Sequence, residues 1–139
     1  MEIKQAQTVA DVQKCAPVLQ ELRPHLEQDT LVAMVMDMFT EGYQLAFVEH
    51  EGTVVATVGY RYLQFLYCGK HLYIDDLVTS SAVRGKGYAS ALLQHVDNVA
   101  RAAGYNVVSL DSGHQRFTAH RLYLNQGYDI VAHHFIKKL

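Results

Sequence analysis

The sequence lacks the features that mark several common protein classes. It contains only two cysteines, Cys15 and Cys68, and no Cys-x-x-Cys pair. Because small secreted scaffolds rely on many disulfides, this favours a reducing, cytoplasmic environment. No stretch approaches the roughly 20 apolar residues that a membrane-spanning helix needs. Residues 1–5 have no apolar run behind their basic residue, so we expect neither a membrane segment nor a signal peptide.

An excess of positive charge is also missing. The formal net charge is −2, whereas a nucleic-acid-binding domain is usually basic, with clustered Lys and Arg. Half of the residues are hydrophobic and 19% are charged, as in ordinary globular proteins. There is no repeat, linker or low-complexity segment, so the chain is expected to form one domain, residues 1–139.

Eight histidines raise the question of a metal site. His114 and His120 are too far apart in sequence to share a helix face at a spacing of four. His133 and His134 are adjacent and would point in opposite directions on a strand. No cysteine lies at ligand spacing, so we expect no bound metal.

Hydrophobic periodicity divides the chain into helices and strands. A short strand is expected within residues 2–7, and the spacing of Thr8 and Asp11 predicts a capped helix start. Pro17 either kinks or divides this helix, and Pro24 ends it. A second helix begins near residues 29–30. Its apolar stripe contains methionines, which either pack in the core, as we favour, or line a flexible substrate pocket.

The remaining elements predict a mixed sheet. Glu51-Gly52 joins two strands into a hairpin, and Gly59 in the second strand indicates a bulge or a close backbone approach. The expected elements are strands at 43–50, 53–63 and 71–79, a helix at 88–103, a strand at 106–110, a helix at 117–125 and a last strand at 129–135. The strands that flank the long helix should be parallel. We therefore expect an α/β (α+β) fold with helices on both faces of the sheet.

A turn with two glycines follows the strand at 71–79 and opens the long helix. Backbone N–H groups at a helix start lack partners and carry the positive end of the helix dipole, so they bind anions. Gly85 and Gly87 have no Cβ, which lets a phosphate approach the backbone closely. The turn predicts a site for a phosphate ester; the alternative is a glycine-rich turn with incidental charge.

Three phosphate-binding patterns compete for this turn. The P-loop spacing GxxxxGK[ST] is absent. Gly85 and Gly87 meet the dinucleotide fingerprint GxGxxG, but Ser90 stands at its third small position, and the repeated βαβ halves of that fold are missing. The pattern Arg-x-x-Gly-x-Ala fits, through Arg84, Gly87 and Ala89.

With these residues, the stretch 74–89 resembles the acetyl-CoA motif of the GNAT superfamily of N-acetyltransferases. Residues 119–128 are similar to the family's pattern A-x-x-[LF]-Y-x-x-x-G-[FY]. The order of elements also matches, so the resemblance spans essentially the whole chain. It implies acetyl-CoA as cosubstrate and a GNAT-like, mostly antiparallel sheet with a splayed pair of parallel strands.

The resemblance also implies the residues that hold acetyl-CoA. The pantetheine arm would lie along the backbone of residues 77–79 like an added strand, and the diphosphate would lie on residues 84–89. The implied contacts are Leu77, Val78, Thr79, Arg84, Gly85, Lys86, Gly87, Tyr88 and Ala89. Two features depart from the family. The loop at 111–114 has no Asn where the family often has one, and a single strand follows the last helix.

The same resemblance assigns the proton donor for the leaving thiolate to Tyr123. A phenol has a pKa of about 10 and a thiol about 8.5, so tyrosine is protonated at working pH. A backbone N–H near Val78 would stabilise the carbonyl oxygen as it gains charge. Taken by itself, Tyr123 is better explained as a core tyrosine of an amphipathic helix; within this motif the catalytic role is favoured.

Asp75 and Asp76 are the candidates for activating the amine. Consecutive strand residues point to opposite faces, so only one should face the acceptor cleft, where it would orient a water or bind a cationic amine. The other should pair structurally, and which one does so stays open. His114 and His120 either line the acceptor pocket or are structural. The tyrosine-rich stretch 60–73 is either an aromatic wall for the acceptor or a half-buried sheet face.

The sequence thus predicts an N-acetyltransferase that acts on a primary amine, small molecule or peptide, without nucleic acid or membrane partners and possibly as a homodimer. A mildly acidic chain with paired Asp leans towards a cationic acceptor. Two other classes stay open: a non-catalytic acyl-CoA-binding sensor or regulatory module, and a dinucleotide-dependent oxidoreductase.

Overall fold

A single five-stranded sheet forms the centre of the computed structural model, which describes residues 1–139. The strands follow one another across the sheet in chain order. They are β1 (Ile3–Gln5), β2 (Gln44–His50), β3 (Thr53–Phe65), β4 (Gly69–Thr79) and β5 (Val107–Leu110). All neighbours are antiparallel except β4 and β5, which are parallel. The expected mixed, mostly antiparallel sheet is therefore confirmed.

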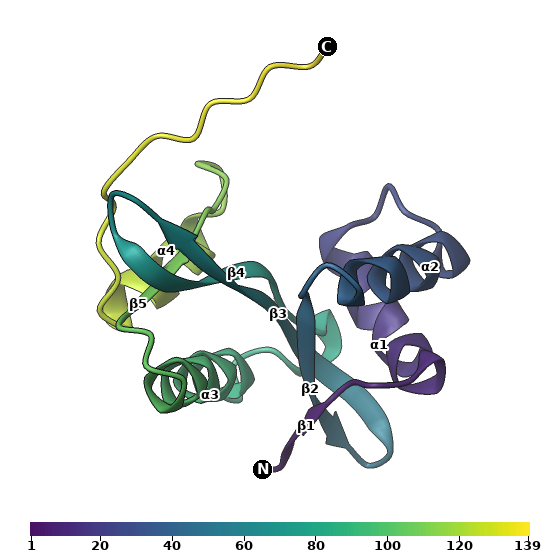
Figure 1. Cartoon of the computed structure of the whole chain (residues 1–139). Helices are drawn as coiled ribbons and strands as arrows, with labels where there is room; N and C mark the ends of the chain where they lie inside the picture. Colours follow the sequence, from purple (N-terminus) through teal and green to yellow (C-terminus); the bar gives the residue numbers. More distant parts are fainter.

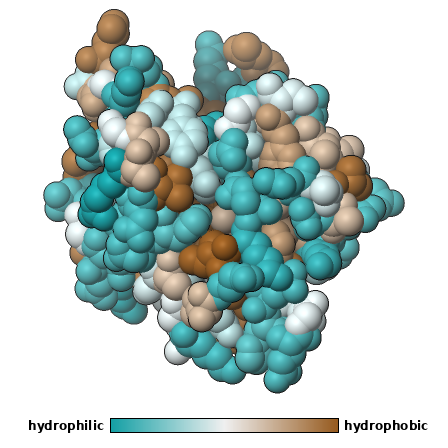
Figure 2. Space-filling view, turned by 60° about the horizontal axis from the view of Figure 1, so that its bottom comes forward, coloured by the Kyte–Doolittle hydropathy of each residue, from teal (hydrophilic) through white to brown (hydrophobic).

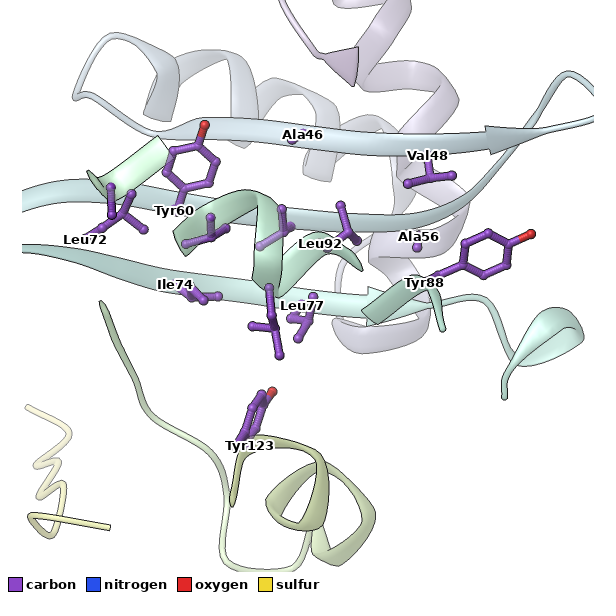
Figure 3. Packing of buried hydrophobic residues seen from close by; sticks show 14 of the residues in the cluster. Ala46, Val48, Ala56, Tyr60, Leu72, Ile74, Leu77, Tyr88, Leu92 and Tyr123 are labelled. Atoms are coloured by element: carbon purple, nitrogen blue, oxygen red, sulfur yellow. The ribbon is translucent and has the colours of Figure 1, made fainter. Parts of the chain in front are cut away.

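Helices cover both faces of the sheet (Figure 1). The helices are α1 (Val9–Leu22), α2 (Gln28–Phe39), α3 (Tyr88–Ala102) and α4 (Phe117–Asn125), with a short 3₁₀ turn at Ser81–Val83. One hydrophobic cluster packs α1 and α2 against one face. A second packs α3, and Tyr123 of α4, against the other face (Figure 3). Both expected layers of helices are present.

The start of α1 follows from its sequence. Thr8 Oγ1 accepts from the Asp11 backbone N–H at 3.1 Å, and the Asp11 carboxylate accepts from the Thr8 N–H at 3.2 Å. The carboxylate also accepts from the Gln7 N–H at 2.9 Å, and this bond, followed by the one from the Thr8 N–H, lowers the pKa of Asp11. Pro17 lies inside the helix without interrupting it. The helix ends at Leu22, before Pro24.

The β2–β3 hairpin turns at the two residues that the sequence indicates. Glu51 and Gly52 have φ angles of 52° and 79°, the left-handed pair that matches the twist of a tight hairpin. At the end of α3, the N–H of Tyr105 bonds to the carbonyl of Ala100 and that of Gly104 to Arg101. These two backbone hydrogen bonds form the pattern that closes a helix ending at a glycine.

The prediction of a strand at residues 129–135 is wrong. After α4 the chain has no secondary structure, and Figure 1 shows it leaving the body of the molecule as an extended trace. No backbone group of residues 129–139 bonds to another backbone group. A β-strand forms only where its backbone groups hydrogen-bond to a neighbouring strand. This segment makes no such bonds to the free edge of β5.

The face of the molecule turned forward in Figure 2 is largely hydrophilic, with hydrophobic residues exposed in small separate groups. More of them lie on the projections at the top of that view. None of the helices combines the length and the apolar character that crossing a bilayer would take.

Candidate active site

A β-bulge in β4 shapes the centre of the site. Gly59 of β3 pairs with Asp76, but the next residue, Tyr60, pairs with Ile74, so Asp75 has no partner in β3. An extra residue breaks the strict alternation of side chains along a strand. Ile74 and Leu77, three residues apart, consequently contribute to the same hydrophobic cluster under α3.

Asp75 and Asp76 both line a cavity of about 430 Å³ between α1, α2 and β4. The expectation that they point to opposite faces is wrong, because the bulge places the extra residue at Asp75. Apolar side chains of the helices and their connection supply most of the wall: Leu19, Leu26, Leu31, Met34, Val35 and Met38. Met34 and Met38 thus line this cavity, and Met34 is 45% exposed.

Asp76 is fully engaged in holding the cavity together. Its Oδ1 accepts from Nε and Nη2 of Arg23 at 3.0 and 2.8 Å, and its Oδ2 accepts from the hydroxyl of Tyr43 at 2.6 Å. Burial, and then the Asp76 carboxylate, raise the pKa of Tyr43 well above its usual value. Asp76, in β4, therefore links that strand to the end of α1 through Arg23 and to the start of β2 through Tyr43.

Asp75 is only half satisfied. Its Oδ2 accepts from Nε of Arg61 at 2.9 Å, while its Oδ1 is buried and has no hydrogen-bond partner. Burial raises the pKa of Asp75 above its ordinary value, outweighing the Arg61 guanidinium, which lowers it. Of the two candidates, Asp75 is the one whose side chain lines the cavity and has a carboxylate oxygen that no protein group engages.

Gly59 makes this arrangement possible. A Cβ at this position would overlap the phenol of Tyr43, which lies across β3 to reach Asp76. We expect Gly59→Ala to lower the free energy of unfolding by about 1–3 kcal/mol, because it overpacks a buried contact. Chemical denaturation measures this loss. The same substitution in a Tyr43→Leu background should cost clearly less, and an equal cost in both backgrounds would contradict the assigned contact.

The parallel strands β4 and β5 separate beside Asp75. Their last pair is Ile74 with Leu110, and residues 77–79 of β4 pair only with β3. The expected splayed pair is therefore confirmed. The hydroxyl of Tyr73 donates to Asp111 Oδ2 at 2.7 Å, which ties the two strands where they diverge. One edge of β4 is left open beyond Asp75.

The glycine turn presents free backbone donors. Gly85 and Gly87 have φ angles of 81° and 82°, and the N–H groups of residues 85–87 form no backbone hydrogen bond. Gly87 is the N-cap of α3 and supplies no side-chain cap. Arg84 and Lys86 are exposed beside it. These are the properties of an anion site at a helix start.

Tyr123 is the one buried residue of α4. Figure 3 shows its ring pointing from α4 towards Leu77 of β4, and both residues belong to the α3-side cluster. Burial raises its pKa, Arg116 opposes this weakly, and no hydrogen bond contributes. Tyr123 and Asp75 thus lie on opposite faces of the sheet, at the region where β4 and β5 have separated.

The structure does not bring the two candidate histidines to the cavity. His114 is exposed in the loop after β5, and His120 Nε2 donates to the carbonyl of Gly113 at 2.8 Å. Their role towards an acceptor stays a prediction. Of the tyrosine-rich stretch only Tyr73 lines the cavity. No three His, Cys, Asp or Glu side chains are placed to hold a metal ion.

Three residues of the site carry no local sequence signal: Arg23, Tyr43 and Arg61. Their partners lie 53, 33 and 14 residues away, so no spacing rule connects them. Two indirect signals exist. Consecutive aspartates on a half-buried strand require cationic or donor partners, and Gly59 indicates that a large group crosses that strand.

Known proteins resemble this chain over nearly its whole length. Residues 8–128 match the Acetyltransferase (GNAT) family. An uncharacterized N-acetyltransferase of Bacillus subtilis strain 168, YhdJ, is 33% identical over 99% of this chain and 98% of its own. A ribosomal-protein-alanine N-acetyltransferase of Brucella melitensis superposes with a TM-score of 0.85 and 16% identity, covering all of both chains.

A predicted acetyltransferase of Clostridium acetobutylicum, solved with acetyl-CoA, superposes with a TM-score of 0.77 and 16% identity over 99% of this chain and 95% of its own. At these identities the solved structures establish the fold, while the match over residues 8–128 and the B. subtilis relative establish the kinship. The open strand pair, the glycine turn and the comparisons agree, and the chain belongs to the GNAT family of N-acetyltransferases.

Proposed function

We propose that this enzyme transfers the acetyl group of acetyl-CoA to a primary amine that enters through the cavity between α1, α2 and β4. The observation that carries this proposal is the buried, unpartnered Oδ1 of Asp75. Asp75 lines the cavity next to the last β4–β5 pair, with Tyr123 on the other face of the sheet.

The backbone and charges of the chain fit acetyl-CoA. The open edge of β4 at residues 77–79 offers main-chain groups to the pantetheine amides, as a further strand would. The free N–H groups of residues 85–87, with Arg84 and Lys86, offer donors and positive charge to the diphosphate. Side chains at Gly85 or Gly87 would be strained at their positive φ angles.

The acceptor proposed here is an amine on a slim apolar arm. The cavity is walled mainly by aliphatic and methionine side chains, and its polar floor holds two carboxylates of β4. Asp76 has both oxygens engaged, whereas Asp75 Oδ1 is free to accept from an ammonium N–H. Methionine side chains adapt to irregular apolar shapes, which suits the arm.

The proposed reaction assigns one task to each residue. Asp75 Oδ1 takes a proton from the ammonium, and the neutral nitrogen attacks the thioester carbonyl carbon. The C–N bond forms, the C–S bond breaks, and the phenol of Tyr123 gives its proton to the sulfur. The second proton that the nitrogen loses passes through solvent and restores the phenol, and Asp75 returns its proton to solvent. A backbone N–H near Val78 stabilises the carbonyl oxygen. The raised pKa of Tyr123 keeps the phenol protonated at neutral pH.

The experiment is an assay of thiol release from acetyl-CoA with a panel of primary amines. We expect the wild type to release thiol faster with alkylamines than with no amine. If it binds CoA but releases no thiol above background with any amine, the proposed reaction is wrong and a non-catalytic acyl-CoA-binding module is favoured instead.

Tyr123→Phe separates the role of the hydroxyl from that of the ring. We expect kcat to fall by about 10- to 100-fold, at the low end for an acid catalyst, because a thiolate leaving group is also protonated by water. The melting temperature should stay near that of the wild type, since the hydroxyl has no bond to lose. An unchanged kcat would remove Tyr123 from the mechanism.

A further inference from the structure

The turn between β3 and β4 places a cysteine against a buried histidine. Sγ of Cys68 lies 3.6 Å from Nδ1 of His71, which is within hydrogen-bond distance for sulfur, and 3.9 Å from the carbonyl oxygen of Gly69. Cys68 is partly exposed, whereas His71, in β4, is 0% exposed. The shorter of the two contacts is the one to the imidazole, so the thiol has a nitrogen base within reach.

The imidazole of His71 has no other hydrogen bond. Its second ring nitrogen, Nε2, is buried without a partner, and the ring of Phe65 packs against it with the ring centres 4.5 Å apart. Buried polar groups normally have partners, and an exception calls for an explanation. The thiol of Cys68 is the one polar group that this imidazole contacts, so the two side chains form an isolated pair.

The pair is open to solvent and remote from the residues assigned to acetyl-CoA. β4 runs from this turn towards residues 77–79, so Cys68 lies at the opposite end of the strand. Figure 1 shows the tip of the β3–β4 hairpin at the left, away from α1 and α2, which wall the cavity. Tyr67, the neighbour of Cys68, is 81% exposed, and the thiol raises the pKa of its phenol.

The other cysteine has none of these properties. Cys15 is fully buried in the core under α1, and burial raises the pKa of its thiol to about 12. The thiolate is the form that reacts with disulfides, and buried structural cysteines are inert. Access from solvent and a neighbouring base therefore distinguish Cys68 from Cys15.

We propose that Cys68 forms a reversible mixed disulfide with a low-molecular-weight disulfide, and that His71 accepts its thiol proton. The proton passes from Sγ to Nδ1, and the thiolate attacks one sulfur of the reagent. The new S–S bond forms as the old one breaks, and the leaving thiolate takes the proton from His71. Cys68 is oxidised and the released half of the reagent is reduced.

The buried position of His71 suits this transient role. A lone charge in such a place is costly, whereas an imidazolium beside the thiolate is paired for as long as the charge exists. A reversible adduct also agrees with a reducing environment, where disulfides are usually transient. The site does not depend on the proposed acetyl transfer.

Intact-mass measurement of the full-length chain after incubation with oxidised glutathione tests the site. We expect the wild type to gain one glutathione and dithiothreitol to remove it. Cys68→Ser should gain none, and because Cys68 is partly exposed, this variant should fold with unchanged circular dichroism. The matched control is Cys15→Ala, which removes the buried thiol and should still gain one glutathione.

The rate of the same reaction tests the base. We expect His71→Asn to react about 10-fold more slowly at neutral pH, because a thiol without a base is only a few per cent thiolate there. His50→Asn makes the same change at an exposed histidine and should react as fast as the wild type.

Three results would overturn the proposal. They are a wild type that gains no glutathione, an adduct that persists in Cys68→Ser, and a folded His71→Asn that reacts as fast as the wild type. The first two are read from variants other than His71→Asn, so they decide the site even if that variant does not fold.

Discussion

Asp75→Asn should lower kcat/KM for an amine acceptor by roughly 100- to 10,000-fold, the range that a positioned base usually contributes. The amide keeps the size of the side chain and can still contact Arg61 through its oxygen. It cannot take a proton from the acceptor, and it presents an N–H₂ or a neutral oxygen where Oδ1 was free. The assay is steady-state thiol release with the best amine of the panel.

Asp76→Asn is the matched control, because it makes the same chemical change at the neighbouring residue. Asp76 bonds to Arg23 and Tyr43, so its loss should lower the free energy of unfolding by about 1–3 kcal/mol through unsatisfied partners. Under conditions in which both variants are fully folded, Asp76→Asn should lower kcat/KM less than Asp75→Asn does. A larger loss of activity in Asp76→Asn than in Asp75→Asn would contradict the assignment of the base.

The pH profile gives a second readout of the same residue. A base acts only when it is deprotonated, so wild-type kcat/KM should fall as the pH drops through the pKa of Asp75, which burial raises above its usual value. Asp75→Asn should lose this acidic limb. The stability change has the opposite sign. Because the folded pKa is raised, the contribution of Asp75 to stability is present at low pH and is lost as the pH rises through that pKa.

Arg84→Glu combined with Gly87→Val should weaken CoA binding by at least roughly 1,000-fold, or about 4 kcal/mol. The first change replaces an attractive charge by a repulsive one beside the diphosphate site. The second places a β-branched residue at a φ of 82° and covers the free N–H groups of the turn. Titration calorimetry with CoA measures the loss.

Arg101→Glu is the control for this double variant. Arg101 lies exposed in the last turn of the same helix, so the net charge changes as it does for Arg84→Glu while the turn is untouched. CoA affinity should remain within a few-fold of the wild type. If the double variant retains wild-type affinity while it is still folded, the diphosphate does not bind at residues 84–89.

The parts of the fold that depend on local chemistry could be predicted from the sequence. The Thr8–Asp11 cap, the Glu51-Gly52 turn and the α3 stripe each involve residues within a few positions of one another. The glycine turn is similar, since its conformation follows from Gly85 and Gly87. The family resemblance then added the splayed strands, which no periodicity indicates.

The parts that failed depend on contacts across the sheet. Alternation assigned Asp75 and Asp76 to opposite faces, but β4 has a bulge at Asp75 in its pairing with β3. The bulge lies beside Gly59, over which the phenol of Tyr43 packs, and these residues are far from Asp75 in sequence. The strand expected at 129–135 has a suitable composition and no neighbour within its own chain. Composition selects a conformation, whereas the partner decides whether a strand forms.

The bulge at Asp75 also switches which side chains of β4 face which core, so that odd-numbered residues after it take the face of even-numbered residues before it. Before it, the even-numbered Leu72 and Ile74 belong to the α3-side core; after it, the odd-numbered Leu77 does, and Val78 belongs to the other core. Deleting Asp75 would make Ile74 and Asp76 consecutive opposite Tyr60 and Gly59, so the ladder would become regular while Leu77 and Val78 kept their present cores. A one-residue gap here in an aligned or redesigned chain therefore implies that the bulge and its carboxylate are lost while the rest of the sheet is kept.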